Sequence, residues 1–77
     1  MDILQSAKDY FDMEYNDAKR FVSRPTADPF WPRQYVDKTY ARCLGVALFV
    51  QQLDVDYETI NEIFEEFKEK INKLLDN

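Results

Sequence analysis

The chain has 77 residues, of which 45% are hydrophobic and 32% are charged, and it contains one cysteine, one glycine and no histidine. A fold of this size buries only about 60% of the surface that its unfolded chain exposes, so its stability depends on dense packing or on self-association. An intrachain disulfide is excluded because Cys43 has no partner, and a structural zinc site lacks its usual ligands. Aromatic residues make up 16% of the chain and can supply dense packing.

The charge balance is acidic, with 15 acidic and 10 basic residues and a net charge of −5. Nucleic acids and anionic membranes repel such a chain unless a local basic patch overcomes the repulsion. The longest uninterrupted apolar run covers residues 43–50, far short of the roughly 20 residues that span a bilayer. Since Asp2 is followed by no long apolar stretch and the single cysteine suits a reducing compartment, we expect a cytoplasmic protein without a signal peptide.

The first predicted element is a helix over about residues 2–22, because apolar residues recur there every three or four positions. Its apolar stripe consists of Leu4, Ala7, Phe11, Tyr15, Ala18 and Val22. Acidic residues come early in this segment, whereas Lys19 and Arg20 lie in its last turns, as the helix dipole favours.

A proline-rich connection follows over residues 23–31, and no helix can continue through it because proline lacks an amide hydrogen and restrains the preceding residue. Pro32 is compatible with the first turn of the next helix. The connection contains two adjacent large aromatic residues, Phe30 and Trp31. We expect these side chains to dock, either within the chain or on a partner.

Helical spacing resumes over about residues 32–52 and again over about 56–75. Asp56 can cap the last helix, and Val55 and Ile60 have the spacing of a hydrophobic staple. Because few residues separate these two helices, we expect them to be antiparallel neighbours. The sequence therefore predicts an all-α fold, a small three-helix bundle that forms a single domain.

The predicted middle helix has two apolar faces when its residues are placed at steps of 100°. The broader face, which suffices to pack against the other helices, consists of Tyr35, Val36, Thr39, Tyr40, Cys43, Val46, Ala47, Val50 and Leu53. The opposite side is polar in its N-terminal half, and its C-terminal half is a second apolar patch. This second patch consists of Ala41, Leu44, Gly45, Leu48 and Phe49.

Two interpretations of the second patch are open from the sequence. In one, the segment with Phe30 and Trp31, or a chain end, folds over the patch. In the other, which we favour, the patch contacts a second chain, most simply an identical one. The small residues Ala41 and Gly45 would let a partner helix approach closely, and this role would explain Gly45, which costs a helix about 1 kcal/mol relative to alanine. We therefore expect a homodimer.

Basic residues are concentrated in residues 19–42, which carry six basic and two acidic residues interleaved with aromatic ones. Such a pattern can grip phosphates and stack bases. The candidate phosphate contacts are Arg20, Arg24, Arg33, Lys38 and Arg42. Pairing of these cations with the acidic flanking segments, or their solvation, explains the pattern better, because the footprint is weak beside that of a basic domain.

Few residues favour catalysis or metal binding. Glu14 falls within the apolar stripe of the first helix, and we expect it to pair with an arginine such as Arg42 or Arg33 because a lone buried carboxylate is costly. Cys43 lies on the core-facing side of its helix, as a small buried hydrophobe does. The acidic residues around Thr59 have spacing similar to that of the ligands in a calcium-binding loop: Asp54, Asp56, Glu58, Glu62 and Glu65. Thr59 stands at the position where such a loop requires glycine, so we do not expect calcium binding.

These observations predict a small non-enzymatic cytoplasmic protein that acts through protein–protein interaction and self-associates, without a metal, a cofactor or a membrane. The alternative is a small nucleic-acid-binding regulator that uses the basic residues of segment 19–42.

Overall fold

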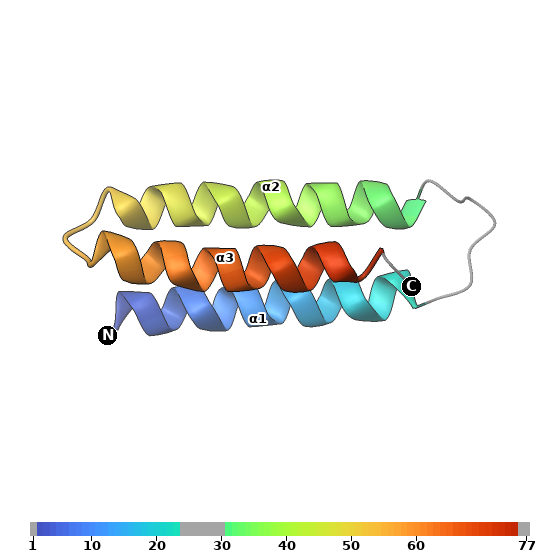
Figure 1. Ribbon diagram of the computed structural model, residues 1–77, viewed down its shortest axis with the longest axis horizontal. Coiled ribbons are helices and arrows are strands. Elements are labelled where there is room, and N and C mark those ends of the chain that lie inside the picture. The colour runs from blue at the N-terminus through green and yellow to red at the C-terminus, as the bar shows by residue number, and fades with distance from the viewer. Residues whose placement is uncertain (1, 24–30, 76–77) are drawn as a thin grey trace.

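The computed structural model describes residues 2–23 and 31–75, and over these ranges the chain forms three helices that lie side by side (Figure 1). They are α1 (Ile3–Val22), α2 (Trp31–Gln51) and α3 (Tyr57–Lys73). The bundle is elongated, with dimensions of 45 × 17 × 16 Å. Helix α2 runs antiparallel to both other helices. The predicted all-α, three-helix fold is confirmed.

Aspartate side chains cap the N-termini of α1 and α3. Oδ1 of Asp2 accepts hydrogen bonds from the backbone N–H groups of Leu4 (3.0 Å) and Gln5 (3.3 Å). Oδ1 of Asp56 accepts one from the N–H of Glu58 at 3.1 Å, and its Oδ2 accepts one from the hydroxyl of Thr59 at 2.8 Å. These bonds satisfy amide groups that lack partners within the helix, so the predicted cap at Asp56 is confirmed.

The core contains aromatic rings from all three helices. Phe11 of α1 lies 5.4 Å from Phe67 and 5.9 Å from Phe64 of α3, measured between ring centroids, and Tyr40 of α2 lies 5.7 Å from Phe64. Each fully buried side chain of this size contributes about 1.5–3 kcal/mol to stability. The buried residues of the core are Ala7, Phe11, Ala18, Val36, Cys43, Ala47, Val50, Ile60, Phe64, Phe67 and Ile71.

The helix ends differ from the predicted ones by one or two residues, and one consequence corrects the sequence analysis. Helix α2 begins at Trp31, with Pro32 in its first turn, and ends at Gln51. The placement of Leu53 on the core-facing side of this helix is wrong, because Leu53 lies in the following turn and is 37% exposed. Steps of 100° apply only to helical backbone, and here the N–H of Leu53 bonds to the carbonyl of Val50, as in a tightened last turn.

None of the helices in residues 2–23 and 31–75 combines the length and the apolar character that a membrane crossing requires.

The cap at Asp56 gives a test of local stability. We expect Asp56→Ala to lower the free energy of unfolding by about 1 kcal/mol, because the N–H of Glu58 and the hydroxyl of Thr59 lose their acceptor. Asp54→Ala, at an exposed position in the same turn, is the control and should change it by less than about 0.5 kcal/mol. Urea denaturation followed by circular dichroism measures both, and equal losses would contradict the assignment of the cap.

Candidate interaction surface

The side of α2 that faces away from the core carries the second apolar patch, which we call the outer patch: Ala41, Leu44, Gly45, Leu48 and Phe49. Phe49 is 65% exposed and Leu48 is 51% exposed. Ala41 and Gly45 are exposed, while Leu44 is half-buried and packs against the core. The described helices therefore leave the side chains of Leu48 and Phe49 more than half accessible.

The orientation of α2 follows from the residues that it buries. Val36, Cys43, Ala47 and Val50 are buried and share one side of the helix with Thr39, which is also fully buried. Because α2 is continuous through residues 41–49, the positions on the side opposite these buried residues face outward, and Leu44 lies at the edge of that side. The outer patch is exposed as a geometric consequence of how the opposite face packs.

Other large apolar side chains are exposed near the turn between α2 and α3. Of the five exposed large hydrophobic residues in the described ranges, only Met13 belongs to α1. The other four are Leu48, Phe49, Leu53 and Tyr57. The exposure of Leu53 and Tyr57 was not predicted from the sequence. The cap at Asp56 could have indicated it, because a helix boundary between these two residues takes them off the regular apolar faces.

Phe30 and Trp31 are the two remaining predicted interaction residues. Phe30 lies outside the described residues. Trp31 is the first residue of α2, but its side chain lies outside the described part of the chain. Docking of these two aromatic side chains stays a prediction.

The predicted phosphate contacts fall into three groups. Arg20 forms an ion pair with Asp17, and Arg42 forms one with Glu14. Arg33 and Lys38 are exposed on α2 and form no ion pair within residues 2–23 and 31–75. Arg24 lies outside the described residues.

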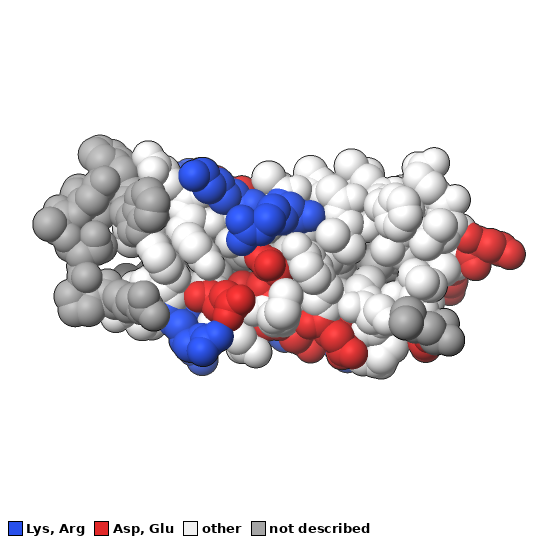
Figure 2. Space-filling model, turned by 180° about the vertical axis from the view of Figure 1, so that it is seen from behind, with Lys and Arg blue, Asp and Glu red and all other residues white. Residues whose placement is uncertain are grey.

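Charge is distributed unevenly along α2. Figure 2 shows basic side chains over its N-terminal half, an uncharged surface over its C-terminal half, and acidic side chains at the end of the molecule where α2 turns into α3. The acidic residues of this turn and of the first turn of α3 are Asp54, Asp56 and Glu58, all exposed. The outer patch therefore lies between a basic segment and an acidic one.

Glu14 and Arg42 join α1 to α2, which confirms Arg42 as the partner rather than Arg33. Nη2 of Arg42 donates to Oε2 of Glu14 at 2.8 Å, and Nε donates to the same oxygen at 3.3 Å. Nη2 also donates to the hydroxyl of Thr39 at 3.3 Å. The hydrogen bond to Glu14 raises the pKa of Arg42, and burial together with the Glu14 carboxylate raises the pKa of Tyr10. The carboxylate is neutralised by a permanent cation, as in a structural ion pair.

Cys43 is fully buried, as predicted. Burial raises the pKa of its thiol to about 12, with the nearby Glu14 carboxylate adding to the effect. Thiolates are the nucleophilic and metal-binding form of cysteine, so the protonated Cys43 is inert at neutral pH.

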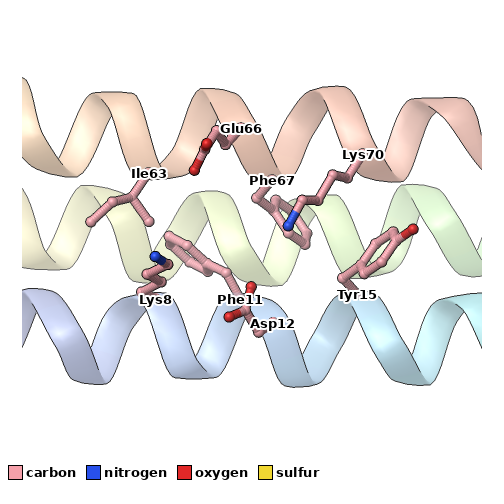
Figure 3. Close-up of a pocket in the computed structure, with 8 residues that line it drawn as sticks. All are labelled: Lys8, Phe11, Asp12, Tyr15, Ile63, Glu66, Phe67 and Lys70. Atoms are coloured by element: carbon pink, nitrogen blue, oxygen red, sulfur yellow. The ribbon is translucent and has the colours of Figure 1, made fainter.

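A small cavity lies between α1 and α3, and the rings of Phe11 and Phe67 are among the side chains that line it (Figure 3). Its volume is about 20 Å³, enough for about one water molecule. Lys8, Asp12 and Glu66 lie at its rim, and Nζ of Lys70 lies 5.6 Å from the centroid of the Tyr15 ring. The cavity is too small for an organic ligand.

The acidic residues around the start of α3 are accounted for by the helix. Asp56 uses both carboxylate oxygens in the cap, and Glu62 and Glu65 line an open acidic groove on α3. In the described part of the chain, no three histidine, cysteine or acidic side chains come together as a metal site would require.

Comparisons of this chain with protein-family models, with curated proteins and with solved structures find no match. The proposed function is therefore based on the physical features of the surface.

The ion pair between Glu14 and Arg42 should stabilise the fold more than the exposed pair of Asp17 and Arg20. The Glu14 side chain is 12% exposed, against 41% for Asp17. We expect Glu14→Gln to lower the free energy of unfolding by about 1 kcal/mol and Asp17→Asn to lower it by only a few tenths. Chemical denaturation measures both values, and a larger loss for Asp17→Asn would contradict this ranking.

The buried thiol of Cys43 predicts a pH dependence. Its pKa is raised from 9.0 to about 12 in the folded state, so the unfolded thiol ionises first as the pH rises. This contribution to stability is complete below pH 9 and is lost as the pH rises toward 12. The stability advantage of the wild type over Cys43→Ala should therefore shrink by about 1 kcal/mol between pH 8 and pH 10. Urea denaturation at several pH values measures it, and a constant advantage would contradict the burial of a neutral thiol.

Proposed function

We propose that this protein acts through protein–protein interaction, including self-association, with the outer patch of α2 as its binding surface. The observation that carries the proposal is the exposure of Leu48 and Phe49 on a helix whose other side is fully packed. Adjacent, exposed large apolar side chains mark interaction sites when they form one patch. Burying the exposed parts of these two side chains would contribute about 1 kcal/mol or more each to association.

Gly45 gives the proposal independent support. Apart from Leu44, Val46 and the backbone of the helix itself, a Cβ atom built on this residue would meet no atom of the described chain within 4 Å, so packing within the bundle does not require a glycine. Glycine in a helix interior nevertheless costs about 1 kcal/mol relative to alanine. Close approach of another helix is a physical reason for keeping the smallest residue at the centre of an exposed patch.

Nucleic-acid binding has weaker support. Arg20 and Arg42 are paired with Asp17 and Glu14, and the chain carries a net charge of −5. A mobility-shift titration at low salt separates the two functions, since phosphate contacts weaken steeply as the salt concentration rises.

Leu48→Glu tests the proposed surface, and Met13→Glu is its matched control because the two residues are 51% and 50% exposed. In sedimentation equilibrium from about 10 μM to about 1 mM, a range that suits a contact smaller than a standard interface, the mass of the wild type should rise with concentration. We expect Leu48→Glu to stay monomeric and Met13→Glu to behave like the wild type. Both variants should unfold within about 0.5 kcal/mol of the wild type at low concentration.

Two results would contradict the proposal. One is a wild type that stays monomeric over the whole concentration range. The other is equal association of Leu48→Glu and the wild type.

A further inference from the structure

The large and small side chains of the outer patch match each other when two copies of α2 run in opposite directions. Small residues, Ala41 and Gly45, lie closest to the outward direction of the helix, within about 20° of the line opposite the buried side. Leu48 lies on one flank of that line and Phe49 on the other. Turning the helix end for end about Gly45 brings residue 49 opposite residue 41, so a large side chain meets a small one.

We propose that the outer patch binds a second copy of this chain, with the two α2 helices antiparallel about a two-fold axis at Gly45. This inference rests on the proposed function and goes beyond it by naming the contacts. Phe49 of each copy packs over Ala41 of the other, and Leu48 packs against Leu44 and Ala41 on the opposite flank. An interface with two-fold symmetry requires a self-complementary surface, which this arrangement of sizes provides.

Charged residues beside the outer patch complete the contact. Lys38 and Arg42 share the flank of α2 on which Phe49 lies. In the antiparallel pair, the ring of Phe49 therefore lies between Lys38 and Arg42 of the second copy. Their aliphatic stems can cover the ring, and a cation near an aromatic face is attracted to it. Each copy thus supplies residues that the other needs to bury Phe49.

Electrostatics favours the antiparallel direction over the parallel one. The antiparallel pair places Lys38 opposite Gln52 and beside the exposed Asp54 of the second copy, so the basic half of each α2 faces the acidic turn of the other. A parallel pair would instead place the two basic segments side by side and the two acidic turns side by side. Its two-fold axis would run along the helices and would put Phe49 against the flank that carries Leu48 rather than against Ala41. Asp37 offsets part of the positive charge of Lys38, but residues 33–42 still carry three basic residues against one acidic residue, so this half of α2 is attracted to the acidic turn of the second copy.

Crosslinking can determine the relative direction of the two α2 helices. The variants Lys38→Cys and Gln52→Cys are mixed and treated with a short bis-maleimide, which spans helices too far apart for a disulfide. We expect the mixed 38–52 product to exceed both homotypic products by about tenfold, since only antiparallel helices bring these positions together. Wild type should give no product because Cys43 is buried, and Lys19→Cys mixed with Gln52→Cys is the matched control on α1.

The outcomes separate this inference from the proposed function. Dominant 38–38 and 52–52 products would overturn the antiparallel arrangement and leave the binding surface standing. A wild type that stays monomeric, with no crosslinked product from any mixture, would overturn both.

A charge exchange tests the pair of Lys38 and Asp54. We expect Lys38→Glu and Asp54→Lys each to weaken self-association by about fivefold at low salt. An equimolar mixture of the two variants should associate like the wild type, because both contacts of the mixed dimer regain opposite charges. Lys19→Glu, which makes the same change of charge on α1, should leave association unchanged. A mixture that associates no better than its components would contradict the antiparallel pair.

Gly45→Ala separates a role in folding from a role in binding. Alanine favours the helix, and its Cβ atom would meet no side chain of another described element within 4 Å, so the melting temperature of the dilute protein should rise by about 4 °C. The added methyl group lies on the proposed two-fold axis, so self-association should weaken by about tenfold. Unchanged or tighter association would place the axis elsewhere.

Discussion

A helix that packs against two others can bury only part of its circumference, and this constraint organises the molecule. Helices α1 and α3 satisfy it with a single apolar stripe and a polar outer side, on which Met13 is the large apolar exception within α1. Helix α2 carries apolar residues on both sides, and once Val36, Cys43, Ala47 and Val50 face the core, Leu48 and Phe49 must face outward. The packing that stabilises the monomer therefore creates the surface through which we propose it binds.

Polar contacts at the edge of the core accompany the apolar packing that orients α2. Arg42 bonds to Glu14 of α1 and to the buried hydroxyl of Thr39, and its position at the boundary between the two faces of α2 keeps the outer patch turned away from α1. Arg42 also lies on the same flank of α2 as Phe49, two turns away along the helix. One residue thus links the packing inside the bundle to the charge around the outer patch.

The ionisable groups that border the core are paired or protonated in the described residues. The thiol of Cys43 is protonated and buried, the Glu14 carboxylate is paired, and the small cavity between α1 and α3 has room for about one water molecule. What distinguishes α2 is a graded surface, basic at one end, apolar in the middle and acidic at the turn. This gradation is the basis of the antiparallel pairing that we propose, because each end of α2 then meets its opposite.

The sequence by itself determined the three helices, the cap at Asp56, the burial of Cys43 and the two-sided apolar character of α2, because all of these follow from local spacing and capping chemistry. It left the partner of Glu14 open between Arg42 and Arg33, and it put Leu53 on the wrong face because the end of α2 at Gln51 is not encoded by periodicity alone. Only the tertiary structure decided that Leu48 and Phe49 stay exposed and that Gly45 has open space above it. Exposure depends on where neighbouring helices lie, and no single helix pattern specifies that.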